Sequence, residues 1–173
     1  MLARLQQVIV VLLLAVAVGG AALFTAAGYP VWGAAVAVLI LLGYALFLAL
    51  EFALLAAVQE SRPAPRPSVI QLLRAWCGEV ATAPQVFLWR QPFRSHAEPD
   101  HVPPQAIGRR GVVLVHGFVC NRGLWNPWLR ELGARGVPRI AVNLEPVFGA
   151  IEDYPHIIEG AVARLEAATG KAV

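Results

Sequence analysis

The chain has 173 residues, of which 58% are hydrophobic and only 14% are charged. Ordinary soluble domains are roughly 45–50% apolar and about 25% charged, so this composition excludes a wholly soluble protein. The net charge is +3 and no block of like charge occurs. Nucleic acid is therefore not an expected partner.

Two apolar runs dominate the first third of the chain, at residues 5–27 and 31–58. Each exceeds the roughly 20 residues that a helix needs to cross a bilayer. Gly28 and Pro30 between them predict a tight turn, so residues 1–60 are predicted to form a transmembrane helical hairpin. A cleaved signal peptide is the alternative for the first run, but the run is long for that role and a second follows at once.

Charged side chains give the hairpin an orientation. Arg4 is the only charged residue before Glu51, the connecting turn carries no charge, and Arg62 and Arg74 follow the second run. The positive-inside rule then places both ends in the cytoplasm and predicts a multi-pass protein of the inner, cytoplasmic membrane. Glu51 is expected at the inner interface, either as a carboxylate reaching toward water or as part of an ion pathway.

Small residues spaced four apart would let the two helices approach closely. General alanine richness is an equally good explanation for the pairs Ala15 and Gly19, Ala22 and Ala26, and Gly33 and Ala37.

Residues 61–106 are predicted to form a proline-rich linker, an amphipathic helix and an edge strand. The linker covers residues 61–68, where alternating prolines favour extended geometry. Ser68 is a predicted N-cap for a short helix that packs either on the following domain or along the membrane surface. Residues 85–89 have the pattern of a strand bounded by Pro84 and Pro92.

A polar loop over residues 95–110 contains His96 and His101. Two histidines five apart in a loop are typical of a solvated segment, and Cys77 and Cys120 also lack metal-ligand spacing. We therefore expect neither a metal site nor a cofactor.

From Gly111 onward the chain alternates between strand and helix patterns. Strands are predicted at residues 112–115 and 140–144, and helices at 124–132 and from the N-cap Asp153 to Gly170. Residues 171–173 could begin another strand. This alternation predicts a parallel sheet with crossover helices.

The first of these strands ends abruptly at His116-Gly117-Phe118. A glycine at a strand end lets the backbone turn sharply and approach a bound group. Backbone N–H groups held there can donate to a developing oxyanion, as acyl transfer requires.

At these residues the chain resembles the amino-terminal half of an α/β-hydrolase of the bacterial esterase and lipase kind, over residues 107–173. The resemblance is carried by three segments, which are residues 112–118, 124–129 and 141–146, and by the helix with Asp153 and Tyr154. It implies that the N–H of Phe118 is one oxyanion donor and that His116 and Gly117 shape the loop.

The resemblance is incomplete, because the family's nucleophile lies in a Gly-x-Ser-x-Gly turn that this chain lacks. A Cys120 thiolate could act instead, although a small semi-buried thiol is the simpler interpretation. His156 is expected at the surface, and capping and solvation account for Glu145 and Asp153. A sheet of two or three strands would leave an apolar edge and one poorly covered face. The protein is therefore expected to continue, to be completed by a second polypeptide, or to be unstable.

Two functions follow as hypotheses. The first is a membrane-anchored serine ester hydrolase, acting on ester or acyl-lipid substrates, of which this chain is the part without nucleophile, acid or base. The second is a non-catalytic membrane protein whose hairpin and partial sheet mediate association with a partner.

Overall fold

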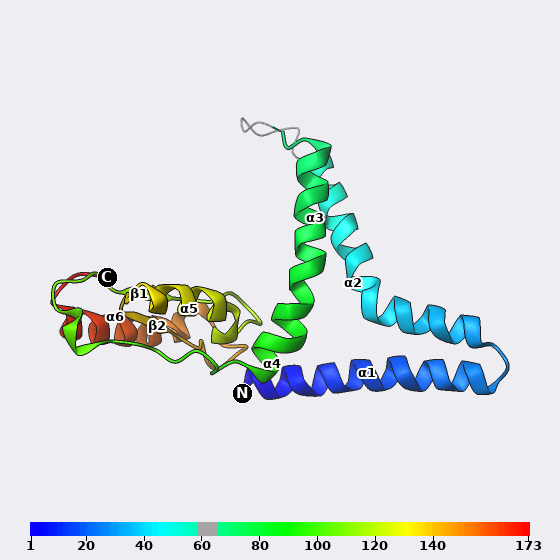
Figure 1. The fold of residues 1–173 in the computed structure, drawn as a ribbon, viewed down its shortest axis with the longest axis horizontal. Helices are drawn as coiled ribbons and strands as arrows, with labels where there is room; N and C mark the ends of the chain where they lie inside the picture. The colour runs from blue at the N-terminus through cyan, green and yellow to red at the C-terminus, as the bar shows by residue number, and fades with distance from the viewer. Residues whose placement is uncertain (59–65) are drawn as a thin grey trace. The chain divides into compact units, whose positions relative to one another are not determined.

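The computed structural model describes residues 1–58 and 66–173 (Figure 1). Most of the predicted linker, including Arg62, lies outside the described residues. The chain separates into two compact units, one made of Val8–Gln85 and the other of Met1–Gln7 together with Val86–Val173. The predicted divisions of the sequence near residues 60 and 106 stay predictions.

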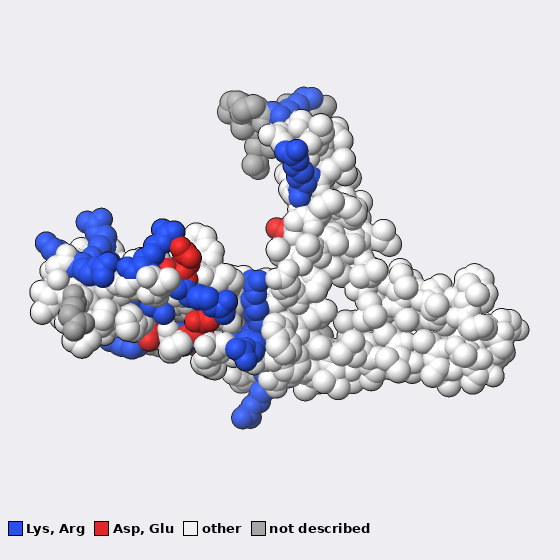
Figure 2. Space-filling view, viewed as in Figure 1, with Lys and Arg blue, Asp and Glu red and all other residues white. Residues whose placement is uncertain are grey.

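Two long apolar helices occupy the first part of the chain, α1 at Leu2–Ala26 and α2 at Pro30–Val58. Both are long and apolar enough to cross a membrane, with mean hydropathies of 2.7 and 2.5. Their large apolar side chains are mostly exposed, and Figure 2 shows long stretches of both without charged atoms. Apolar surface of this extent is what a lipid environment covers.

The chain reverses direction between these helices. Gly28 has φ +87°, and the N–H of Tyr29 donates to the carbonyl of Phe24 at 2.8 Å. A Cβ atom on Gly33 would lie 2.7 Å from the carbonyl oxygen of Ala21, so α2 meets the backbone of α1 near this turn. Gly33 is the one predicted small residue whose close approach is evident.

Helix α3, at Val69–Pro84, begins at a capping box made by Ser68 and Gln71, as the sequence predicted. It packs on α2. Trp76 Nε1 donates to the carbonyl of Ala45 at 2.9 Å, and the Tyr44 hydroxyl donates to the carbonyl of Val80 at 2.8 Å.

The strand predicted at residues 85–89 is wrong. This segment is a π-helix, Gln85–Arg90, followed by the short helix α4 at Gln91–Phe93. Pro84 lies inside the helical run. A proline in a helix lacks one N–H and crowds the preceding turn, and here the chain continues with wider turns after it.

The second unit contains a parallel pair of strands, β1 at Val112–Leu114 and β2 at Arg139–Ala141, with Val112 opposite Arg139. Helix α5, at Asn126–Ala134, connects them, and α6, at Pro155–Thr169, follows. The predicted parallel pairing with a crossover helix is confirmed. Two strands do not by themselves define an α/β-hydrolase fold.

Both faces of this sheet are covered. On one face Leu129 of α5 packs with Leu114 and Ala141. On the other face Leu165 of α6 packs with Ile140, among others. The expectation of a poorly covered face is therefore wrong, because α6 covers the face that α5 leaves.

The two edges of the sheet differ. The outer edge of β2 is bridged in antiparallel fashion by His101, whose N–H donates to the carbonyl of Arg139 at 3.0 Å. On β1, the N–H of Val112 and the carbonyl of Leu114 bond toward β2. The backbone groups of Val113 must then face the opposite, open edge.

Helix α6 ends as predicted at Gly170, which has φ +65°. The predicted N-cap role of Asp153 is wrong. Its carboxylate accepts the N–H of Ala150 at 2.8 Å and so closes the 3-10 turn Ile151–Asp153, one turn before α6. Residues 171–173 form no strand.

Candidate functional site

The loop that follows β1, residues 116–121, is called here the β1 loop. A tight turn lies within it, because the N–H of Cys120 donates to the carbonyl of Gly117 at 3.2 Å. Val119, the third residue of that turn, has φ +57°. This region of φ suits glycine or asparagine and is strained for a β-branched residue. Strain of this kind persists only where the surroundings hold it, and it is common at functional sites.

His116 braces the loop against the segment after β2. Its Nε2 accepts the N–H of Leu144 at 3.1 Å, and its Nδ1 lies 2.9 Å from the carbonyl of Gly117. These partners assign a neutral ring with the proton on Nδ1. Burial lowers the pKa of His116, while the bond to Gly117 raises it by a smaller amount. His116 thus shapes the loop and is not available as a general base.

Phe118 lies at the tip of the turn and is 74% exposed. Among the described residues its backbone N–H has no acceptor. Its ring meets the ring of Phe148 edge-on at a centroid distance of 6.0 Å. An N–H that is fixed in a tight turn and has no acceptor can bind an oxyanion.

An apolar pocket of about 350 Å³ has Phe118 and Val119 of this turn in its lining. Both loops that follow the strands contribute to its lining, which includes Phe118, Val119, Leu144, Val147, Ile151 and Tyr154. The Tyr154 hydroxyl donates to the carbonyl of Pro146 at 2.8 Å and holds the second loop against α6. The pocket has the size and chemistry of a site for an apolar group.

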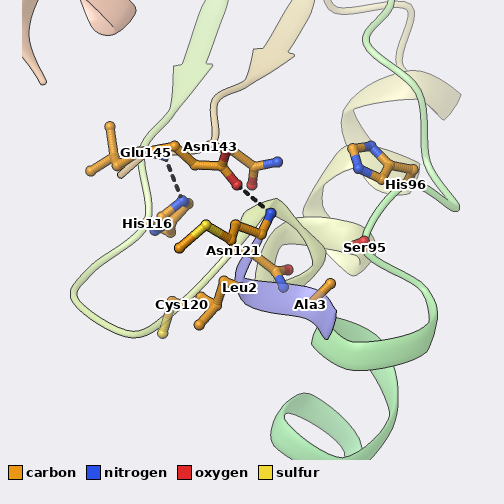
Figure 3. A pocket seen from close by; sticks show the side chains of 11 residues that line it. Leu2, Ala3, Ser95, His96, His116, Cys120, Asn121, Asn143 and Glu145 are labelled. Carbon is orange, nitrogen blue, oxygen red and sulfur yellow. Dashed lines mark hydrogen bonds and ion pairs between the residues drawn. The ribbon is translucent and has the colours of Figure 1, made fainter. Parts of the chain in front are cut away.

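A second cavity, of about 370 Å³, also has His116 in its lining and contains several polar side chains (Figure 3). Ser95 and His96 form one part of its wall, and His116, Cys120 and Asn143 form another. Within the described part of the chain no hydrogen bond joins the Ser95 hydroxyl to either histidine. The cavity therefore lacks a nucleophile paired with a base.

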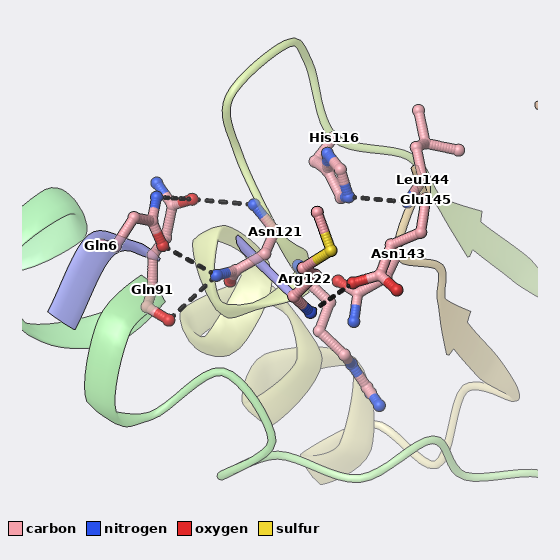
Figure 4. Close-up of polar contacts among 9 residues, drawn as sticks. Gln6, Gln91, His116, Asn121, Arg122, Asn143, Leu144 and Glu145 are labelled. Atoms are coloured by element: carbon pink, nitrogen blue, oxygen red, sulfur yellow. Dashed lines mark hydrogen bonds and ion pairs between the residues drawn. The ribbon is translucent and has the colours of Figure 1, made fainter. Parts of the chain in front are cut away.

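Three buried amides, Gln6, Gln91 and Asn121, form what is called here the amide cluster (Figure 4). The N–H of Asn121 donates to Gln91 Oε1 at 2.8 Å, and Asn121 Nδ2 donates to Gln6 Oε1 at 3.0 Å. Gln6 Nε2 donates to Gln91 Oε1 at 3.2 Å and to the carbonyl of Val119 at 3.3 Å. The cluster connects the first turns of α1 and α4 to the β1 loop.

An ion pair holds the far side of the loop. Arg122 Nη2 lies 2.7 Å from Asp100 Oδ1, and the same oxygen accepts the N–H of Ala141 at 3.1 Å. The N–H of Arg122 donates to Asn143 Oδ1 at 2.9 Å. These contacts connect the loop to the end of β2.

The remaining sequence candidates do not enter a reaction centre. Burial raises the pKa of the Cys120 thiol, and a hydrogen bond with Gln91 lowers it by a smaller amount, so Cys120 is a poor nucleophile at neutral pH. His156 is exposed, as expected. The Glu145 carboxylate accepts from the terminal amino group of Met1 at 2.7 Å.

The structure brings His116, Gly117 and Phe118 together with residues that the sequence did not single out as functional, which are Gln6, Gln91, Asn121 and Arg122. Gln6 and Gln7 do interrupt an apolar run, and this was the one sequence signal for the amide cluster.

Among residues 1–58 and 66–173 no group of three histidine, cysteine or acidic side chains could hold a metal ion. Comparison with protein-family models, with curated proteins and with solved structures gave no match. The resemblance to α/β-hydrolases thus rests on the residues of this chain alone.

Proposed function

We propose that this chain supplies the oxyanion-binding and acyl-binding part of a membrane-anchored serine ester hydrolase. The single observation that carries the proposal is the Phe118 N–H, which has no acceptor among the described residues and stands in a strained, braced turn beside an apolar pocket. In acyl transfer such a donor stabilises the negative charge that develops on the carbonyl oxygen.

The apolar pocket supports an ester with an apolar acyl group as substrate. With the carbonyl oxygen at the Phe118 N–H, the acyl chain would extend between the two loops, against Leu144 and Val147. A pocket lined by apolar side chains and approached by one fixed polar donor is the usual arrangement for orienting such a ligand.

The nucleophile is the part that these residues do not provide. The Cys120 thiol is kept protonated by burial, and both nitrogens of His116 already have backbone partners. The proposal therefore assigns the serine, the acid and the base to residues outside the given sequence, with the serine in a Gly-x-Ser-x-Gly turn.

The inner, cytoplasmic membrane is the proposed location. Two helices of sufficient length and hydropathy support an anchor, and Arg4 near its start and Arg74 after its end in the sequence favour a cytoplasmic location for both ends. Burial of Gln6 in that unit supports retention of the first helix, because cleavage as a signal peptide would remove Gln6 from its partners.

The coding sequence after the codon for Val173 and an assay of its product test this proposal. A Gly-x-Ser-x-Gly motif within roughly 15 residues is expected. In that protein Phe118→Pro removes the N–H and should lower kcat for short-chain esters by about 10²–10³-fold, whereas Phe118→Leu keeps the N–H and should stay within about tenfold. Absence of the motif, or equal loss in both variants, would refute the proposal.

The open edge of β1 favours one other function, association with a partner. Val113 presents its backbone groups away from β2, and an unpaired strand edge is a template for another strand. Purification of the 173-residue chain in detergent distinguishes the two functions. A monodisperse, cooperatively unfolding chain without esterase activity supports association, and proteolysis of Val86–Val173 supports the hydrolase.

A further inference from the structure

We propose that Gln6, in the first turns of the apolar helix α1, is a positioning residue for the β1 loop, so that the first membrane helix forms part of the site as well as its anchor. Its importance for catalysis rests on the proposed ester hydrolysis. The positioning itself rests only on the contacts of the amide cluster.

The contacts of Gln6 fix both of the residues that flank Cys120. Both hydrogens of Nε2 are used, one for Gln91 Oε1 and one for the carbonyl of Val119, and Oε1 accepts from Asn121. A flipped Gln6 amide would set its Nε2 against the Asn121 donor and its Oε1 against the Val119 carbonyl. The orientation of this side chain is therefore dictated by its partners.

Burial makes these bonds specific. Gln6 is 7% exposed, Asn121 is 4% exposed and Gln91 is fully buried. A buried amide without partners costs free energy, so loss of Gln6 leaves the Val119 carbonyl and one donor hydrogen of Asn121 unsatisfied. Among the described residues only Gln6 donates to the Val119 carbonyl.

The strained residue is the one that Gln6 holds. Val119 keeps φ +57° although a β-branched side chain disfavours that region. Its carbonyl bond to Gln6 and the anchoring of Asn121 restrain the turn on its carboxyl side, while His116 restrains the other side. The Phe118 N–H lies between these two restraints.

Gln7 is a matched control. It has the same side chain and lies next to Gln6 on α1, and its Nε2 donates to the carbonyl of Pro92 at 2.7 Å. Gln7 therefore attaches α1 to the α4 segment but makes no hydrogen bond to the β1 loop. Loss of either glutamine weakens the attachment, and only loss of Gln6 should change the loop.

The test uses the Cys120 thiol, which lies between the two held residues, as a probe in the full chain carrying Cys77→Ser. In detergent micelles, Gln6→Met should raise the alkylation rate of Cys120 by about tenfold, as expected when one or two ordinary hydrogen bonds are lost. Its pH profile should move to lower pH as the thiol becomes solvated. Gln7→Met should leave the alkylation rate and its pH profile unchanged, although its Tm should fall about as much as that of Gln6→Met.

Equal alkylation rates and pH profiles in folded Gln6→Met and in the parent chain would overturn the inference, as would equal changes in Gln7→Met. If Gln6→Met does not fold, Gln6→Glu keeps the length and the acceptor oxygen but loses the donor to Val119, and the same readouts apply. Because no esterase activity is measured, failure here is distinct from failure of the proposed hydrolase.

Discussion

Val119 shows how one residue reports on its surroundings. Its φ of +57° costs an L-residue roughly 1–2 kcal/mol, and glycine avoids this cost. We therefore expect Val119→Gly to be more stable than Val119→Ala by about 1 kcal/mol in denaturant unfolding. Val137, which is partly buried and has no positive φ, is the control at which alanine should be the more stable replacement. If the glycine and alanine variants had the same order of stability at Val119 and at Val137, strain at Val119 would be contradicted.

His116 should make the stability of its unit depend on pH. Burial sets its folded pKa below the unfolded value of about 6.5, so the unfolded chain binds the proton more readily. The contribution is complete above about pH 6.5 and is lost as the pH falls through the folded pKa, when a proton on Nε2 would displace the Leu144 N–H.

His116→Gln keeps an acceptor for Leu144 without a titrating ring. Denaturant unfolding between about pH 5 and 8 should therefore show a weaker loss of stability in acid for His116→Gln than for the parent chain. His156→Gln, at an exposed position, should follow the parent. Identical curves for all three proteins would show that His116 does not carry the dependence.

Sequence patterns identify some of these residues and cannot identify others. The glycine and histidine after an apolar strand predict a loop that shapes a backbone donor. Gln6 breaks an apolar run, but its partners lie 85 and 115 positions away, and no local pattern encodes such contacts. A buried amide is explained only by its partners, and these become visible when the chain is folded.

Among the elements, the hairpin depends on a close contact that glycine permits. A side chain on Gly33 would collide with the backbone of α1 at Ala21, whereas Gly19 has nothing within 4 Å of its Cβ position. Gly33→Val should therefore separate the helices, at a cost of about 1–3 kcal/mol, while Gly19→Val should not.

A cysteine pair measures this contact. In a chain without other cysteines, Gly20→Cys and Val36→Cys should form a disulfide, because a Cβ on Gly20 would lie 3.6 Å from a Val36 methyl carbon. Adding Gly33→Val should reduce the oxidised fraction severalfold, and adding Gly19→Val should leave it unchanged. Equal oxidation in both variants would place the contact elsewhere.

The elements differ in how well local sequence encodes them. The strands β1 and β2 can be predicted from the sequence, because each is a short apolar run and a helical pattern lies between them. The segment Gln85–Arg90 has the apolar composition of a strand, but it continues the helix beyond Pro84 as a π-helix. Composition alone cannot separate these two outcomes.

At the scale of the whole molecule, the division of the chain into two compact units bears on its membrane topology independently of the charged residues. Met1–Gln7 and Val86–Val173 belong to one compact unit, held in part by the amide cluster. If α1 and α2 span a membrane, the first turns of α1 and the residues from Val86 onward are therefore expected on the same side of it. The chain between them is then expected to cross an even number of times, which agrees with the two helices of suitable length.

Single cysteines in a chain without other cysteines test this topology with a membrane-impermeant maleimide on intact cells. Leu5→Cys and Glu159→Cys, both at exposed positions of the same unit, should be labelled alike, and Tyr29→Cys, in the turn between α1 and α2, should be labelled oppositely. The positive-inside rule predicts that only Tyr29→Cys is labelled from outside. Labelling of Tyr29→Cys and Glu159→Cys from the same side would show that the hairpin does not span the membrane. Opposite labelling of Leu5→Cys and Glu159→Cys would be incompatible with the contacts of Gln6, and the first helix could then have no part in the site.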